Sequence, residues 1–464
     1  MRDCFFLRFH DRRRSGLAKL HLPPIMSQFY IYLYLFTGAV IIGLYLRRQM
    51  RVSSSNAAEL QQAIETGMAE PASLHPVINT AGCIGSGSCV TACPEEALGL
   101  VNGKAVLKNG SACIGHGTCM AACPIDAIQL VFGTEKRGMD IPNIDPDFQT
   151  NVPGIYIAGE LGGMGLIRKA ATQGRQAMDA IKKNLDTSGA DATGFDVDVL
   201  IVGCGPAGLS AGLSAMQHKL RYRLIEQEPE LGGTVYHYPR NKIAMTAPFE
   251  LALVGKVKFN EVQKEKLLAF WQDVVDRTKL QISFSETMEA ITPKDGGGFV
   301  VKTSRGSYTA RAVLLAMGRR GSPRKLEVPG EEGSPKVVYR LIDAEQYKGQ
   351  NVLVVGGGDS ALEAAIAVSE QPGTTVTLSY RSAAFSRVKG KNRSRLEEQQ
   401  AAGRIRVVLN SKVKAVGTDT VDLHFDGENE RLPNDAVIVC AGGLLPTPLL
   451  QSIGIRFDTK FGTV

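Results

Sequence analysis

Two apolar runs in this chain of 464 residues each end in a cluster of glycines. The first, VLIVGCGPAG at 199–208, predicts a buried strand, a tight turn and a helix from Leu209 to His218, and a second strand, YRLIEQ, follows at 222–227. The second run, NVLVVGGGDSA at 351–361, precedes a predicted helix and the strand TVTLSY. Strands that alternate with helices predict α/β domains with parallel sheets.

A third apolar run lies near the N-terminus. Residues 29–46, FYIYLYLFTGAVIIGLYL, carry no charged side chain, and about 18 such residues are near the lower limit for a membrane-spanning helix. Tyrosines gather at its first end and arginines follow its last residue, as at membrane interfaces. We expect a single-pass membrane protein; a cleaved signal or a peripheral or buried helix is the alternative. If translation starts at Met26 rather than Met1, everything from Arg47 onward is expected in the cytoplasm.

Two cysteine runs match each other almost residue for residue. CIGSGSCVTACP at 83–94 and CIGHGTCMAACP at 113–124 are both Cys-x5-Cys-x3-Cys-Pro. Thiolates are soft ligands that suit zinc or iron–sulfur clusters, but structural zinc prefers closed Cys4 or Cys2His2 spacings. A disulfide framework is not implied, because the remaining cysteines are scattered singly at 4, 204 and 440. The six repeated cysteines are therefore predicted to hold iron–sulfur clusters.

These runs resemble the two halves of a bacterial two-cluster ferredoxin, in which the last cysteine of each run ligates the other cluster. The resemblance implies an α+β ferredoxin-like module and the ligand sets Cys83, Cys89, Cys123 and Cys113, Cys119, Cys93. The second cysteine of each ferredoxin run is replaced, by Ser86 and by His116. Three interpretations stay open: [3Fe-4S] clusters, [4Fe-4S] clusters with Ser86 or His116 as a ligand, or a labile fourth iron. Neither residue need be a ligand.

The first glycine cluster has the spacing of a dinucleotide-binding turn. Gly203, Gly205 and Gly208 follow a strand and open a helix, which allows close approach to a pyrophosphate at the helix N-terminus. Glu226 stands about 20 residues on, where a carboxylate binds a ribose hydroxyl.

The second cluster, Gly356-x-Gly358-x-x-Ala361, has no acid after its second strand. Arg381 and Ser382 stand there instead, with Arg387, Lys389 and Lys391 nearby. Because a 2′-phosphate is bound by Arg, this site is predicted to prefer NADPH to NADH, although the two lysines fit a solvated face better than a contact.

The order of these motifs resembles the thioredoxin reductase-like flavoproteins with two dinucleotide domains, over roughly residues 140–464. LLAMGRRGSPR around Gly318, VPGE at 328–331 and CAGGLLPTPLL at 440–450 carry the resemblance with both glycine clusters. The resemblance implies FAD at the first site and a nicotinamide cofactor at the second. Implied FAD contacts are Gly203, Gly205, Pro206, Ala207, Gly208, Glu226, Gly232, Gly233, Thr234 and Gly318. Implied nicotinamide-cofactor contacts are Gly356, Gly358, Asp359, Ser360, Arg381, Ser382 and Arg387.

Two departures from that family are informative. The segment that usually ends such chains, here VPGIYIAGELGGMGLIRKAATQGRQAMDAI at 152–181, precedes the first glycine cluster, so residues 140–185 are predicted to fold back and close the FAD domain. That element would bring Gly159, Glu160 and Gln173 to the flavin. The redox-active Cys-x-x-Cys is absent, and Cys204 and Cys440 are expected to be packing residues. His237, near the isoalloxazine in this interpretation, fits either proton transfer or a structural role.

The net charge of +7 comes partly from arginines flanking the N-terminal apolar run, and no basic–aromatic array suggests nucleic acid. Predicted domains are an anchor at 1–55, a linker helix at 56–75, the ferredoxin-like module at 76–135, an FAD domain at 140–329 and 441–464, and an NAD(P) domain at 330–440. We expect an enzyme: a membrane-anchored oxidoreductase passing electrons from NADPH through FAD and clusters to a quinone, cytochrome or carrier protein, or the reverse. No catalytic residue is assigned, and a homodimer is left open.

Two other functions compete with that prediction. One is a disulfide reductase that uses the dithiol of a partner protein. The other is a non-enzymatic redox sensor in which three-thiolate clusters gain or lose iron.

Overall fold

The computed structural model describes residues 24–65, 69–71, 74–135, 138–163, 165–187, 193–240, 242–319, 321, 323–385, 388 and 390–462, without the side chains of 24–29, 31 and 245. The chain divides into two compact units, Met1–Ser55 and Asn56–Val464. Arg387, predicted at the nicotinamide site, and Lys389 beside it lie outside the described residues, as do Met1 and the side chain of Met26.

Helix α1 (Pro24–Glu65) takes in both N-terminal segments for which separate helices are predicted. Thr37, Gly38 and Gly43 interrupt its apolar side chains, and Arg47 and Arg48 follow the run directly. Within the described part of the chain, no helix has an apolar stretch sufficient to cross a membrane. The prediction of a single-pass membrane protein with cytoplasmic redox domains is therefore wrong.

The cysteine runs lie in a small module that opens the second unit. Its strands form two antiparallel pairs, β1 (His75–Ile78) with β4 (Ile128–Val131) and β2 (Leu98–Val101) with β3 (Lys104–Leu107). Each cysteine run contributes one short helix, α2 (Ser88–Thr91) or α3 (Thr118–Ala121), and a 3-10 turn, η1 (Gly110–Ala112), lies between them. The last turns of α1 pack here: Asn56 Nδ2 donates to Leu100 O at 3.0 Å. Whether this module has the ferredoxin-like fold stays a prediction.

The first glycine cluster lies in a six-stranded sheet. Along its main path the order is β13 (Met288–Pro293), β14 (Phe299–Thr303), β15 (Gly306–Leu315), β7 (Val197–Val202) and β8 (Tyr222–Ile225). Every residue of β7 is buried, as the apolar run predicts for a central parallel strand. Strand β6 (Ile155–Ile157) pairs in parallel with the end of β15, so the segment that precedes the glycine cluster joins this sheet.

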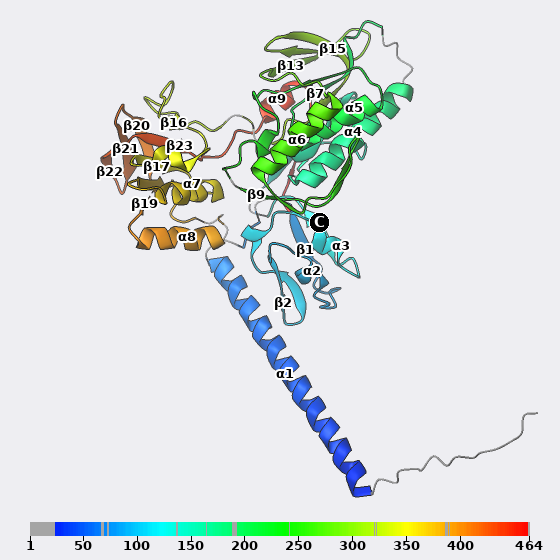
Figure 1. Cartoon of the computed structure of the whole chain (residues 1–464), viewed down its shortest axis with the longest axis vertical. Coiled ribbons are helices and arrows are strands. Elements are labelled where there is room, and N and C mark those ends of the chain that lie inside the picture. Colours follow the sequence, from blue (N-terminus) through cyan, green and yellow to red (C-terminus); the bar gives the residue numbers. More distant parts are fainter. Residues whose placement is uncertain are drawn as a thin grey trace, which may run out of the picture. The chain divides into compact units, whose positions relative to one another are not determined.

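Helices α4 (Ile167–Thr187), α5 (Pro206–Gln217) and α6 (Lys264–Thr278) gather beside this sheet (Figure 1). Short pieces connect these elements: η2 (Gly159–Gly162), η3 (Gly233–Val235), β9 (Ile243–Met245), β10 (Phe249–Leu251), β11 (Gly255–Val257) and β12 (Glu261–Gln263). Helix α6 begins only at Lys264, because the residues just before it pair as β12 with β9.

The second glycine cluster lies in a separate parallel sheet of order β16 (Val337–Val338), β23 (Ala436–Val439), β17 (Asn351–Val355), β18 (Thr375–Ser379) and β19 (Ile405–Val408). Helices α7 (Asp359–Ser369) and α8 (Gly390–Ala401) lie beside it (Figure 1). An antiparallel sheet of β20 (Lys412–Val416), β21 (Thr420–Phe425) and β22 (Glu428–Pro433) packs on it through a shared apolar core. A 3-10 turn, η4 (Ala344–Tyr347), precedes β17.

The end of the chain returns to its middle. After α9 (Thr447–Ser452), strand β24 (Phe457–Lys460) pairs antiparallel with β5 (Met139–Pro142), just beyond the cysteine module. The segment between the cysteine module and β6 is thus paired with β24.

Candidate functional site

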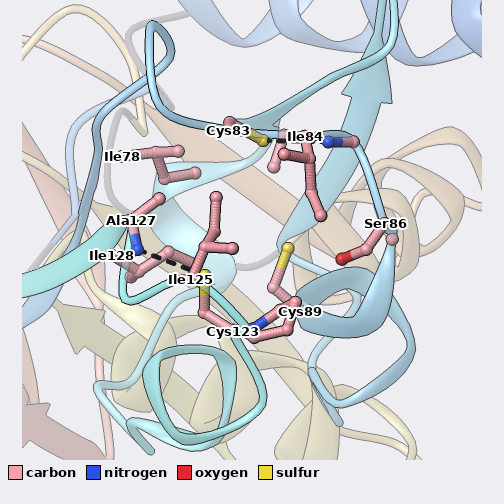
Figure 2. A pocket seen from close by; sticks show the side chains of 13 residues that line it. Ile78, Cys83, Ile84, Ser86, Cys89, Cys123, Ile125, Ala127 and Ile128 are labelled. Carbon is pink, nitrogen blue, oxygen red and sulfur yellow. Dashed lines mark hydrogen bonds between the residues drawn. The ribbon is translucent and has the colours of Figure 1, made fainter.

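Three thiols from the two cysteine runs surround one pocket. Cys83 and Cys89 come from the first run and Cys123 from the second, as the cross-over interpretation predicts. In Figure 2 their sulfurs face the same space, and the hydroxyl of the exposed Ser86 points toward the sulfur of Cys89. The remaining lining is largely apolar, with Ile78, Ile84, Ile125 and Ile128 among its residues.

Backbone amides point at these sulfurs. Gly85 N donates to Cys83 Sγ at 3.4 Å and Ala127 N donates to Cys123 Sγ at 3.3 Å. Hydrogen bonds from backbone amides, that of Ala105 first, lower the pKa of the Cys83 thiol, whereas burial raises the pKa of Cys89. Gly85 must be glycine here, because its φ is 71° and a Cβ would stand 2.1 Å from Gly103 O.

The other three thiols form a second group, since Cys119 lies close enough to Cys113 and Cys93 to interact with both electrostatically. Burial raises the pKa of Cys119 to about 11 and also raises that of Cys113. His116, at the place of Ser86 in this run, is half-buried.

The donor chemistry of the two groups fits iron–sulfur clusters, because each group offers three thiols and backbone amides donate to the sulfurs of Cys83 and Cys123. Within the described residues, no group of three or more His, Cys, Asp or Glu side chains forms a site for a single metal ion. When iron–sulfur centres are present, Cys83, Cys89 and Cys123 would hold one and Cys93, Cys113 and Cys119 the other.

The first glycine loop is tightly fitted between β7 and α5. A Cβ at Gly203 would lie 2.7 Å from Ala316 O, and one at Gly208 would lie 1.8 Å from Gly203 O. Gly205 has no such neighbour, and an added Cβ would approach only Gly233 Cα, at 4.0 Å. Helix α5 begins at Pro206, three residues before the predicted start, because proline is suited to the first helical position. The turn therefore leaves room for a phosphate at the helix N-terminus.

Glu226 is buried at the end of β8 beside this loop. Its Oε2 accepts from Cys204 N at 2.6 Å and its Oε1 accepts from Glu228 N at 3.0 Å. Burial raises the pKa of the Glu226 carboxyl, and these two amides oppose that rise only in part. The carboxylate is thus fixed in the place where the sequence predicts a ribose contact.

The segment around β6 meets the same loop. Gly159 N donates to Gln173 Oε1 of α4 at 2.9 Å. A Cβ at Gly174 of α4 would lie 2.0 Å from Ala207 O, so α4 and α5 touch backbone to backbone. Around Gly318, Glu160 Oε2 and Thr234 Oγ1 would lie 3.9 and 4.0 Å from an added Cβ. Residues predicted for one FAD site from four distant segments are thus close together; their role as contacts stays a prediction.

The second glycine loop resembles the first at its first two glycines. Gly358 has nothing within 4 Å of an added Cβ, while Gly356 is backed by Cys440 O at 2.4 Å. Asp359 begins α7 and accepts from Asn392 Nδ2 at 2.7 Å, and Ser360, Arg381 and Ser382 are exposed. The ring of Tyr380 stacks on Phe385, with centroids 5.3 Å apart, and a Cβ at Gly357 would lie 2.1 Å from it. Sequence reasoning did not anticipate this ring beside the loop.

Thiol chemistry and proton transfer have little support from the other candidates. Cys204 is fully buried, and burial raises its pKa well above the usual range; burial also raises the pKa of Cys440 to about 12. His237 Nε2 lies 3.3 Å from Glu228 Oε1, and burial lowers the pKa of His237. Among the described residues, its Nδ1 has no hydrogen-bond partner.

Two lysines that the sequence did not single out reach the cysteine loops. Lys104 Nζ, from the β2–β3 hairpin, donates to Cys83 O at 2.6 Å. Lys169 Nζ, from the first turn of α4, lies 3.4 Å from the position of a Cβ on Gly117. No local signal marks either residue, because each contact joins segments far apart in the chain.

Two dinucleotide folds beside a cysteine module define the class of this protein: it is an FAD-dependent NAD(P)H oxidoreductase with an iron–sulfur domain. The chain belongs to the pyridine nucleotide-disulphide oxidoreductase family, whose profile matches residues 200–461. A second profile, described as a 4Fe-4S dicluster domain, matches residues 75–124. The predictions of an enzyme with these cofactor classes are confirmed.

Similar proteins extend over the flavoprotein part. A ferredoxin–NADP reductase from Ignicoccus hospitalis is 31% identical over 273 residues, which are 57% of this chain and 83% of that protein. Bacilliredoxin reductase Bdr from Bacillus subtilis is 27% identical over 270 residues, 57% of this chain and 82% of that protein. Among solved structures, bacillithiol disulfide reductase Bdr from Staphylococcus aureus shares 25% identity, with 56% of this chain and 81% of that chain covered at a TM-score of 0.49.

Proposed function

We propose that this enzyme transfers electrons between NADP(H) and a one-electron carrier of the ferredoxin type, by way of FAD and two built-in iron–sulfur centres. When bound, the flavin exchanges electron pairs with the nicotinamide and single electrons with iron–sulfur centres. The similarity to a ferredoxin–NADP reductase supports the nicotinamide end and the carrier.

One observation carries this proposal: helix α4 joins the two kinds of site. Through Gln173 and Gly174 it packs on the loop predicted to bind FAD, and its first turn brings Lys169 to the second cysteine run. A single helix of 21 residues therefore contacts both redox sites, which favours a short path between them.

Residues at the two glycine loops and in the two cysteine runs each have a role along this path. Gly203, Gly205 and Gly208 make room for the pyrophosphate of FAD, and Glu226 binds its ribose hydroxyl. At the second loop, Gly356 and Gly358 leave space for the nicotinamide cofactor, and the exposed Arg381 contacts the 2′-phosphate, which favours NADPH. Each set of three cysteines holds one iron–sulfur centre.

An internal dithiol is not part of this function. Cys204 and Cys440 are protonated at neutral pH because burial raises the pKa of each, and a thiol must ionise to attack a disulfide. The other described cysteines belong to the two runs that hold the iron–sulfur centres.

The test is EPR spectroscopy of anaerobically purified protein, with iron, sulfide and flavin quantified, before and after one equivalent of NADPH. We expect iron at both sites and a signal that changes on NADPH addition. A signal lost on reduction means three-iron centres, and a signal gained means four-iron centres with a further ligand such as Ser86. Intact flavin that NADPH bleaches without any change at iron contradicts the proposal.

A partner-dependent disulfide reductase is the second candidate, supported by the similarity to bacilliredoxin reductase Bdr. One variant distinguishes this candidate from the proposed function. In it, four cysteines are changed to Ser: Cys83, Cys89, Cys113 and Cys119. The proposed function requires that this variant lose NADPH-driven reduction of a ferredoxin. Full NADPH-dependent reduction of a bacilliredoxin disulfide by the same variant would favour the second candidate.

A further inference from the structure

Lys169 places a positive charge from the flavoprotein part of the chain beside the second cysteine run. Its Nζ lies 3.4 Å from the position of a Cβ on Gly117, two residues before Cys119. The side chain is half-buried, and Cys119 lies within its electrostatic reach. Gly117 has a φ of 75°, which glycine adopts readily. Because glycine has no side chain, this position also leaves space for the ammonium of Lys169.

A charged partner of its own does not explain the position of the Lys169 ammonium. Among the residues that the structure describes, no carboxylate pairs with it and no hydrogen bond engages its ammonium. Burial and the neighbouring Arg168 both lower its pKa, so the position is costly for a cation by itself. Burying an unpaired ammonium is unfavourable unless a negative group compensates it. A centre held by three thiolates is negatively charged, and reduction makes it more so.

The first cysteine run differs at the equivalent position. An added Cβ on Gly87 would have only Leu100 Cδ1 within 4 Å, at 3.5 Å. The lysine of that site, Lys104, comes from the same module and donates to the backbone oxygen of Cys83. Lys104 thus reaches the first site from within the module, whereas Lys169 reaches the second from the helix that also packs on the predicted FAD loop.

We propose that Lys169 is a positioning residue that raises the reduction potential of the centre held by Cys93, Cys113 and Cys119 and so increases the driving force for electron transfer to it from the flavin. Reduction adds one electron to the centre, and the ammonium stabilises the added charge; no covalent bond forms or breaks. Net charge is among the factors that set iron–sulfur potentials. This inference rests on the proposed function for the route of the electron, but the potential itself does not depend on NADPH.

The experiment is an EPR-monitored redox titration of the full chain with dithionite and mediators. Signals are first assigned to each site with Cys83→Ser and Cys113→Ser. We then expect Lys169→Met to lower the ratio of reduced to oxidised second centre about tenfold at a fixed potential, a shift of about 59 mV for one electron. Lys169→Arg should keep most of the wild-type potential. The matched control, Lys104→Met, should move only the first centre.

Three results would overturn the inference. One is a Lys169→Met protein with full iron content and an unchanged second potential, and another is an equal shift of both centres. The third is loss of the second centre from both Lys169→Met and Lys169→Arg, which would make the residue structural. If the potentials shift as expected but NADPH reduces neither centre, the tuning role stands and the proposed function fails.

Discussion

The two glycine loops of this protein match at their first two glycines but differ at the third position and in the charged residue beside them. Backbone oxygens stand 2.7 Å from an added Cβ at Gly203 and 2.4 Å from one at Gly356, while Gly205 and Gly358 are both open. In the loop after β7, Gly208 takes the third position, and the buried Glu226 accepts from Cys204 N. In the loop after β17, an alanine takes the third position, and the charged residue is the exposed Arg381. A buried anchor suits a resident cofactor, whereas an exposed one suits a cofactor that exchanges.

The largest effect is expected from Gly208→Ala. The new Cβ would stand 1.8 Å from Gly203 O, so the loop must shift, at a cost of about 1–3 kcal/mol or more. We expect loss of most bound flavin and a lower melting temperature, measured by flavin absorbance per chain and thermal unfolding. The control is Gly358→Ala, whose added Cβ meets nothing within 4 Å, and it should leave both unchanged. Equal flavin content in the two variants would show that the third position of the first loop is not constrained.

A smaller effect is expected at the second loop from Arg381→Ala. Removing one exposed contact to a 2′-phosphate should raise KM for NADPH roughly tenfold, about 1.4 kcal/mol, without changing kcat. KM for NADH should stay the same, because NADH lacks that phosphate. Steady-state reduction of ferricyanide with each cofactor provides the measurement. A parallel rise for both cofactors would mean that Arg381 supports the loop rather than the phosphate.

The smallest effect concerns the buried carboxylate. Burial raises the pKa of Glu226 above its unfolded value of about 4.3, so the folded apoprotein holds the proton longer than the unfolded chain does. Its contribution to stability is therefore present below that value and declines as pH rises through the raised pKa. Glu226→Gln should flatten this decline in thermal melts of flavin-free protein from about pH 4 upward. An unchanged pH profile would show that Glu226 is not the titrating group.

Glu331 provides a control, because its pKa is shifted in the opposite direction to that of Glu226. It is also buried, but although burial opposes ionisation, the amides of Leu326 and Glu327 and the hydroxyl of Tyr339 lower its pKa overall. Its stabilisation is present above the unfolded pKa and is lost as pH falls through the lowered one. Glu331→Gln should therefore weaken the decline in stability on the acid side.

The sequence predicted local units well, because their signals are local. The strand, turn and helix at each glycine cluster form as expected, and Pro206 shows in hindsight why α5 starts early. The pairing of Ile243–Met245 with Glu261–Gln263 and the reach of Lys169 escaped prediction, since each joins residues distant in sequence. The N-terminal run was misjudged because interface tyrosines and glycines were counted toward an apolar length that the described residues do not reach.

The pairing of β24 with β5 has a consequence for synthesis. The cysteine module and β6 leave the ribosome long before β15, whose residues 313–315 pair with 155–157. At about 5–20 residues per second, that partner arrives roughly 8–30 s later. The pairing with residues 139–142 comes later still, after residues 457–460 have been made. The nascent chain therefore presents its cysteines while the flavoprotein part is still unclosed, and β5 waits for a partner from a distant part of the chain.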